Sequence, residues 1–318
     1  MARSPRRSTP KPPSERTALP DRIAPMLAQI ATEPFDSPEH AFEIKWDGVR
    51  CIALVEPGQL RLQNRRFSEM REQYPELAGL SELPAGTVVD GEIIVLDSGR
   101  SSFQKLAQRI HLNDPARIAM ASRRLPTTFV VFDLLYSAGV SVMDQSLRER
   151  RVLLTALIGE LKDPHVVAAD FVEGQGLAYF EAAKQAGLEG IMAKRLDSPY
   201  LPGKRTSHWT KIKVARVDAF DILGYVQREG QPFVSALILG LHEGKRWKYK
   251  GNVGTGFTEA QRGEWYRKLK PLPALVDPPK DGPKDAAWRT TNLRCRVRFF
   301  EETADGRLRG PVFESLEG

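Results

Sequence analysis

The sequence has few cysteines and no long apolar run. Its 318 residues include only two cysteines, Cys51 and Cys295, which have neither a CxxC spacing nor neighbouring histidines to complete a zinc site. Neither a disulfide framework nor a zinc centre is therefore expected, and a reduced, cytoplasmic setting is predicted. No apolar stretch approaches the roughly 18 residues of a membrane span, and the basic N-terminus lacks the apolar segment of a secretion signal. We expect neither membrane association nor export.

The charge balance is basic. Lys and Arg number 47 against 40 Asp and Glu, a formal net charge of +7, which favours a polyanionic partner through phosphate neutralisation. The length and the 41% hydrophobic content suffice for two domains. Residues 1–20 are basic, rich in proline and poor in apolar side chains, and are predicted to form a disordered tail. That tail either is a solvated terminus or binds weakly to a phosphate backbone.

Residues 21–214 are predicted to form an α+β domain. Short runs rich in Val, Ile and Phe, bounded by Gly, Pro and Asp, predict strands over residues 42–46, 49–55, 88–96 and 129–135. Capping-box spacings at Ser101…Gln104 and Ser146…Glu149 predict helix starts, and Gly187 is a stop signal after residues 177–186. Strand pairs with inserted helices are typical of an α+β fold.

Residues 215–318 are predicted to form a small β-barrel. Strand-like runs cover residues 219–226, 235–242, 246–251 and 295–301, a helix opens at Thr258, and the proline-rich residues 271–284 form a loop. About five strands in roughly 100 residues is the size of an OB-fold, a barrel that often binds nucleic acid. Arg294, Arg296 and Arg298 alternate along one strand face, which either contacts DNA or is merely solvated.

The strongest local signal is the octapeptide EIKWDGVR, residues 43–50. Asp47-Gly48 between two β-like runs predicts a tight hairpin that places Lys45 at a strand end, where its amine can project into a pocket. A lysine nucleophile must lose its proton, and a neighbouring cation such as Arg50 depresses the lysine pKa. The alternative is a solvated hairpin lysine.

Further segments carry carboxylates, an aromatic ring and paired lysines. Glu92 follows a second Asp-Gly, and Glu189 follows a helix stop; such carboxylates are natural Mg²⁺ ligands. Phe132 ends an apolar run and can stack on a purine or belong to the core. If residues 209–213 form a strand, its period of two aligns Lys211 and Lys213 with Trp209. A phosphate between the two ammonium groups explains that arrangement, as does an exposed edge strand.

In this order, the segments resemble the motifs of ATP-dependent DNA ligases, most closely the short bacterial ligases of the end-joining type. The resemblance covers residues 25–314 and includes FEIKWDGVR, EGIMAKR and PGKR followed by WTKIK. It implies a nucleotidyltransferase (adenylation) domain of antiparallel sheets with helices, followed by a C-terminal OB-fold domain. It also implies an enzyme of the bacterial cytosol or nucleoid that works as a monomer.

The resemblance implies roles for individual residues. Lys45 would be the catalytic residue that carries AMP, and Glu92 and Glu189 would bind the metal. Arg65 matches a motif arginine, although Asn64 stands where the family usually has serine. The implied nucleotide-binding residues, including the adenine-recognising Glu43 and the adenine-stacking Phe132, are Glu43, Ile44, Arg50, Arg65, Glu92, Phe132, Glu189, Arg205, Lys211 and Lys213.

The resemblance implies repair of nicked or broken duplex DNA with ATP and Mg²⁺, or Mn²⁺ in its place. End-bridging or polymerase proteins on other chains are the expected partners. The family usually ends with a basic RxDK-like motif that this sequence lacks. Either Arg307 and Arg309 substitute for it, or the chain is naturally or artificially short, or self-adenylylation is impaired while sealing of pre-adenylylated ends survives. The alternatives are an RNA ligase, a GTP-using capping enzyme, or a non-catalytic protein that binds DNA nicks or ends.

Overall fold

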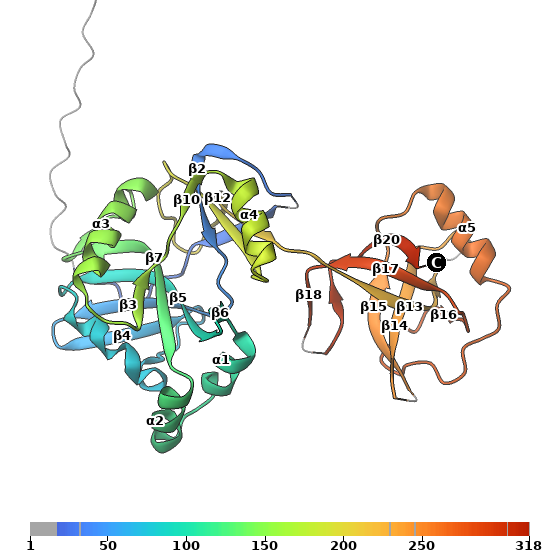
Figure 1. The fold of residues 1–318 in the computed structure, drawn as a ribbon, viewed down its shortest axis with the longest axis horizontal. Coiled ribbons are helices and arrows are strands. Elements are labelled where there is room, and N and C mark those ends of the chain that lie inside the picture. The colour runs from blue at the N-terminus through green and yellow to red at the C-terminus, as the bar shows by residue number, and fades with distance from the viewer. Residues whose placement is uncertain (1–17, 32, 229, 245, 304, 318) are drawn as a thin grey trace, which may run out of the picture. The chain divides into compact units, whose positions relative to one another are not determined.

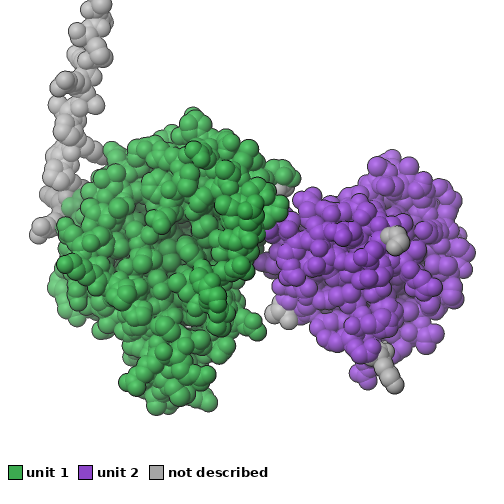
Figure 2. Space-filling view, in the orientation of Figure 1, with its two compact units in different colours: residues 1–213 green, residues 214–318 purple. Residues whose placement is uncertain are grey.

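The computed structural model describes residues 18–31, 33–228, 230–244, 246–303 and 305–317. The predicted basic tail, residues 1–20, lies outside the described residues apart from residues 18–20. The chain divides into two compact units, residues 1–213 and 214–318 (Figure 2). Within the described ranges, no helix has both the length and the apolar character that crossing a membrane requires.

Unit 1 contains two sheets. The larger has the order β4-β3-β5-β7-β8, with β6 beside β5 and β9 beside β7. Its strands are β3 (Val49–Glu56), β4 (Gln59–Asn64), β5 (Thr87–Asp97), β6 (Arg100–Ser101), β7 (Thr127–Ser137), β8 (Val140–Ser141) and β9 (Val166–Ala168). The smaller sheet has the order β1-β12-β11-β2-β10, formed by β1 (Leu27–Ala31), β2 (Ser37–Ile44), β10 (Val172–Gly174), β11 (Gly190–Arg195) and β12 (Arg205–Lys213).

Helices cover and connect these sheets (Figure 1). They are η1 (Arg71–Gln73), η2 (Pro75–Glu82), α1 (Phe103–Ile110), α2 (Pro115–Arg124), α3 (Leu147–Glu160) and α4 (Gly176–Gln185). The predicted capping box of Ser146 and Glu149 opens α3, but Ser102 rather than Ser101 caps α1. Gly187 follows α4 with φ of 68°, a conformation that glycine adopts without strain.

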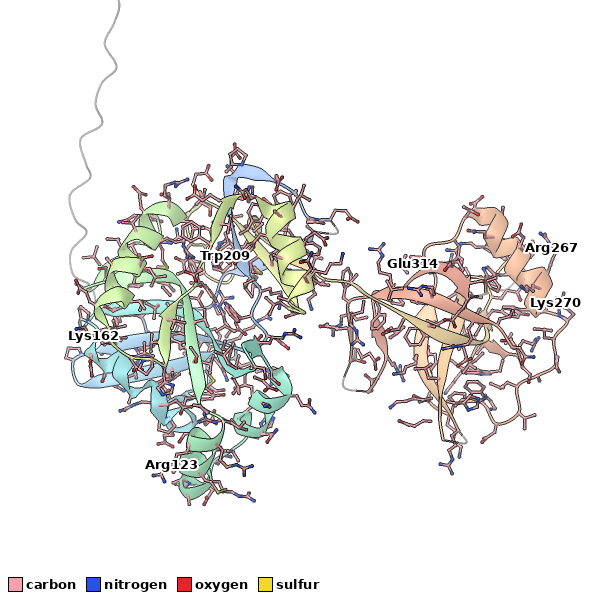
Figure 3. The ribbon with its side chains drawn as sticks, viewed as in Figure 1. Arg123, Lys162, Trp209, Arg267, Lys270 and Glu314 are labelled. Carbon is pink, nitrogen blue, oxygen red and sulfur yellow. The ribbon has the colours of Figure 1, made fainter. Side chains whose placement is uncertain are left out.

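The larger sheet of unit 1 is buried on both faces. Side chains alternate along β3, so Cys51 and Ala53 belong to a core that includes residues of η2 and α3, whereas Ile52 and Leu54 belong to a second core. That second core also contains Trp209 of the smaller sheet, which Figure 3 labels in the interior of unit 1. The two sheets therefore pack face to face, and the carboxylates and cations described below are held between them.

The predicted hairpin at Asp47-Gly48 is wrong. Strand β2 pairs with β10 and β11, whereas β3 pairs with β4 and β5, so residues 45–48 cross from one sheet to the other. Lys45 nevertheless follows the end of β2, as predicted. A Cβ on Gly48 would lie 2.3 Å from the carbonyl oxygen of Ile93, so the glycine permits the crossing chain to run against β5.

The described residues of unit 2 form a curled sheet with a helix packed against it. The order β15-β14-β13-β17-β20, with β16 beside β13, uses β13 (Arg216–Val226), β14 (Ala236–Glu243), β15 (Arg246–Val253), β16 (Ala286–Trp288), β17 (Arg294–Phe299) and β20 (Val312–Glu317). A separate pair comprises β18 (Glu301–Glu302) and β19 (Leu308–Arg309). Trp265 and Leu269 of α5 (Glu259–Leu269) belong to the core of the sheet. This half-barrel and the two-sheet unit 1 confirm the predicted α+β class.

Candidate active site

A pocket of about 230 Å³ lies in unit 1, lined by strands from both sheets. Except for Glu189 and Lys213, all the predicted site residues line it: Glu43, Ile44, Lys45, Arg50, Arg65, Glu92, Phe132, Arg205 and Lys211. Met192, Lys194 and Trp209 are among the other lining residues. Segments that are more than 150 residues apart in the sequence thus meet around one cavity.

Lys45 is held at this pocket by its backbone and by a carboxylate. Its amide donates to the carbonyl oxygen of Gly190 over 2.9 Å, which ties the end of β2 to the start of β11. Its Nζ contacts Oε2 of Glu189, while Oε1 of Glu189 lies 2.8 Å from Nζ of Lys213. Glu189 and Lys213 therefore belong to the site through Lys45, although they do not line the pocket.

Cations gather on one side of Lys45. Burial lowers the pKa of Lys211, and the nearby charges of Lys213, Lys45 and Arg205 lower it further. Lys211 and Trp209 both line the pocket, whereas Ile212, the residue after Lys211, is buried. A bound phosphate would relieve the repulsion among these cations, so this side of the pocket is suited to a polyphosphate.

Two carboxylates near Lys45, Glu92 and Glu189, could hold a magnesium ion. Burial raises the pKa of Glu92 to about 7; Arg50 and Lys45 oppose this effect, and Asp90 and Glu189 add to it. Among the described residues no three His, Cys, Asp or Glu side chains form a metal cluster. Mg²⁺ commonly binds one or two carboxylates together with substrate phosphates and water, so Glu92 and Glu189 could serve as its protein ligands once phosphate is bound.

Replacement of Glu92 by glutamine is expected to stabilise the protein at pH 8 but not at pH 5. The folded pKa of about 7 lies above the ordinary glutamate value of 4.5, so folding favours the protonated carboxyl group. The stability contributed by this group is present at low pH and is lost as the pH rises through about 7. Thermal unfolding should show a Tm increase of several degrees for Glu92→Gln at pH 8 only.

The exposed Glu82 provides the control for this measurement. Glu82→Gln should leave Tm unchanged at both pH values. An equal Tm difference for Glu92→Gln at pH 5 and pH 8 would contradict the assigned protonation.

Glu43 lies at the buried end of the pocket, and its side chain is only 2% exposed. Nη1 of Arg151 contacts its Oε1, and Nζ of Lys194 lies 2.6 Å from its Oε2. The predicted adenine-recognising carboxylate is therefore balanced by two cations, Arg151 and Lys194, that were not among the predicted site residues. Period-two alternation along residues 190–195 would have placed Lys194 on the pocket face with Met192. No sequence signal linked Arg151 to Glu43.

Phe132 also faces the pocket but has few exposed atoms. Its ring is 8% exposed and packs edge-to-face against Trp209 at 6.0 Å between centroids. Nζ of Lys194 lies 4.1 Å, and Cζ of Arg50 4.7 Å, from the Phe132 centroid. These cation–π contacts fix the aromatic wall of the pocket. The stacking role of Phe132 stays a prediction.

The arginines proposed to replace the last family motif already have acidic partners in unit 2. Arg307 lies 3.1 Å from Asp305 and 3.8 Å from Asp281, and Arg309 lies 2.6 Å from Glu301. These pairs are exposed, so each contributes little stability and can exchange its partner for a phosphate. Their substitution for the motif stays a prediction.

Comparison with known families and proteins assigns both units. Residues 25–213 match the family described as "ATP dependent DNA ligase domain", and residues 230–317 match the "ATP dependent DNA ligase C terminal region". The chain is 33% identical over 313 residues to "Multifunctional non-homologous end joining protein LigD" of Mycolicibacterium smegmatis, covering 95% of this chain and 39% of that protein. It is 31% identical to the "SPbeta prophage-derived DNA ligase-like protein LigB" of Bacillus subtilis, covering 92% and 98%.

Solved structures agree with these sequence matches. The ligase domain of Mycobacterium tuberculosis LigD has a TM-score of 0.57 and 31% identity, with coverage of 93% of this chain and 95% of that domain. A mycobacterial DNA ligase D complexed with ATP gives a TM-score of 0.56 with the same identity and coverage. The chain spans less than two fifths of the Mycolicibacterium and Pseudomonas LigD proteins, 39% and 36% of their lengths.

Proposed function

This chain belongs to the ATP-dependent DNA ligase family, and we propose that it seals 5′-phosphate/3′-hydroxyl nicks or breaks in duplex DNA through a lysyl-AMP on Lys45. The observation that carries the proposal is the position of the Lys45 amine. It lies at a pocket that is also lined by Glu92 and by the cations Lys211 and Arg205. An amine among phosphate-binding groups is suited to attack phosphorus.

Different residues of the site have different roles in the three steps of the proposed reaction. In the first step the Lys45 amine attacks the α-phosphate of ATP, forms a phosphorus–nitrogen bond and releases pyrophosphate, whose charge Lys211 and Lys213 stabilise. The AMP then passes to a DNA 5′-phosphate, and the 3′-hydroxyl displaces AMP to close the strand. Glu43 and Phe132 hold the adenine throughout. Mg²⁺ held by Glu92 and Glu189 would neutralise phosphate charge.

The same proposal includes a biological role, a cellular location and an oligomeric state for this protein. The relatives named for non-homologous end joining support a role in the repair of DNA breaks. We place this role in the bacterial cytoplasm, with the chain acting as a monomer beside end-bridging or polymerase proteins on other chains. Size-exclusion chromatography with light scattering tests the monomer, since a mass of twice 35.6 kDa would overturn it.

Nick sealing tests the central proposal. Purified protein with ATP and Mg²⁺ is expected to convert a nicked DNA duplex with a labelled 5′-phosphate into a full-length strand, as seen by denaturing electrophoresis. A duplex with a 5′-hydroxyl at the nick is the control and should remain unsealed, because it has no phosphate to accept AMP.

The alternatives give different products in the same assay. Sealing of an RNA nick in preference to DNA would indicate an RNA ligase. A covalent adduct with GTP rather than ATP would indicate a capping enzyme. Nick binding with neither sealing nor adduct would indicate a non-catalytic binder. The family matches favour the DNA ligase over all three.

A further inference from the structure

Arg50 lines the pocket, and a buried carboxylate holds its guanidinium group in place. Its Nε and Nη2 donate to Oδ1 and Oδ2 of Asp90 over 2.5 and 2.6 Å, and Asp90 is fully buried. Nη2 also donates to the carbonyl oxygen of Met26 over 3.3 Å. Nη1 takes no part in these three bonds, so this nitrogen can contact a phosphate oxygen. The bidentate pair fixes the plane of the guanidinium group.

A tyrosine from a distant segment completes this arrangement. The Tyr200 hydroxyl donates to Oδ2 of Asp90 over 2.7 Å and accepts from the amide of Met26 over 2.9 Å. Its side chain is 1% exposed, and its ring packs edge-to-face against Trp209 at 5.7 Å. The hydroxyl therefore bonds the same carboxylate oxygen that receives Nη2 of Arg50.

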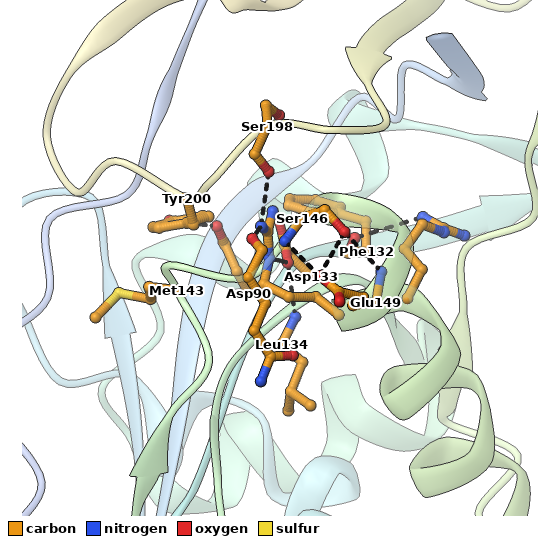
Figure 4. A network of polar contacts seen from close by, with 12 residues as sticks. Asp90, Phe132, Asp133, Leu134, Met143, Ser146, Glu149, Ser198 and Tyr200 are labelled. Carbon is orange, nitrogen blue, oxygen red and sulfur yellow. Dashed lines mark hydrogen bonds and ion pairs between the residues drawn. The ribbon is translucent and has the colours of Figure 1, made fainter. Parts of the chain in front are cut away.

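The segment that carries Tyr200 is itself anchored. Nη1 of Arg150 donates to the carbonyl oxygen of Ser198 over 2.9 Å, and both members of the Arg150–Asp133 pair are fully buried. The Tyr200 amide donates to the carbonyl oxygen of Met143 over 2.8 Å. Figure 4 shows Asp90, Asp133, Ser198 and Tyr200 within one polar network. With the backbone of this segment held, rotation of the Tyr200 ring away from Asp90 would break its packing against Trp209.

We propose that Tyr200 is a positioning residue for the ligase reaction, whose hydroxyl holds Asp90, and through it Arg50, in the orientation that contacts phosphate. The inference rests on the proposed function. Neither Tyr200 nor Asp90 lines the pocket, so the hydrogen bond between the Tyr200 hydroxyl and Asp90 acts on a bound phosphate through Arg50. Loss of the hydroxyl lets the carboxylate and guanidinium rotate together, and a small displacement at a transferring phosphate has a large effect on rate.

The test compares Tyr200→Phe with Tyr74→Phe. Tyr74 is also 1% exposed, but its hydroxyl has no hydrogen-bond partner among the described residues, and it lies in the other core. The rate constant of lysyl-AMP formation at saturating ATP is expected to fall roughly tenfold for Tyr200→Phe, with little change in the KM for ATP. Tyr74→Phe should retain the wild-type rate.

A double-mutant cycle separates positioning from a general loss of structure. In an Arg50→Ala background, Tyr200→Phe should change the rate by less than about twofold, because the group that it positions is absent. A tenfold loss in both backgrounds, or a wild-type rate for Tyr200→Phe, would overturn the inference. The wild-type protein is measured first: if it forms no lysyl-AMP, the proposed function itself fails, which is distinct from failure of the positioning role.

Discussion

Replacement of Lys45 by alanine is expected to abolish covalent labelling of the protein by α-labelled ATP. No other amine in the pocket is placed to substitute. Lys194 is 1% exposed and lies 2.6 Å from Glu43, and Lys211 is on the side of the pocket predicted to bind phosphate. Denaturing electrophoresis should show a labelled 35.6 kDa band for the wild-type protein and none for Lys45→Ala.

Two further variants sharpen this prediction. Lys45→Arg keeps a cation beside Glu189 but has no nucleophilic amine, so it should also remain unlabelled. Its behaviour separates loss of the nucleophile from loss of the ion pair. Lys162→Ala is the matched control, since Lys162 is exposed on unit 1 (Figure 3) and should label normally. Labelling of the Lys45→Ala protein would show that another residue is the nucleophile.

A pre-adenylylated nick distinguishes loss of the first step from unfolding. Sealing of that substrate needs the 3′-hydroxyl to displace AMP and does not use Lys45 as a nucleophile. Lys45→Ala should therefore retain measurable sealing of the pre-adenylylated nick. Loss of both activities with a normal unfolding transition would show that the Lys45–Glu189 contact also organises the later step.

The sequence predicted which residues line the pocket better than it predicted which strands pair with one another. A run rich in Val, Ile and Phe predicted the strand that carries Phe132, and period-two alternation aligned Lys211 with Trp209 on the condition that residues 209–213 form a strand. Both signals are local. The hairpin at Asp47-Gly48 failed because strand pairing is decided by partners far along the chain. A turn sequence reports local backbone conformation, not the sheet to which the next strand belongs.

The contacts around the site could not be predicted from the sequence for the same reason. Asp90 stood beside Glu92 in a predicted metal-binding segment, yet the structure pairs it with Arg50 and Tyr200, 40 and 110 residues away. Arg151 reaches Glu43 across 108 residues. Buried charges require such partners, but a single sequence does not say which arginine supplies each one.

Replacement of Arg150 by alanine is expected to destabilise unit 1 by about 3–5 kcal/mol, the usual cost of leaving a buried charge without its partner. Arg150 and Asp133 are fully buried, with Nε 2.7 Å from Oδ1 and Nη2 2.9 Å from Oδ2. The substitution also leaves the carbonyl oxygens of Gln145 and Ser198 without a donor. Urea unfolding at 25 °C, with the transition of unit 1 followed separately, measures the loss.

Arg148 on the same helix provides the matched control for Arg150. It pairs with Glu173 at 2.8 Å, but its side chain is 55% exposed, so Arg148→Ala should cost at most about 1 kcal/mol. The double variant Arg150→Met/Asp133→Leu should recover part of the loss, because it removes the uncompensated charge. If Arg150→Ala cost no more than Arg148→Ala, Asp133 would have to be protonated or hydrated after the substitution, and the buried pair would not hold the segment that carries Tyr200.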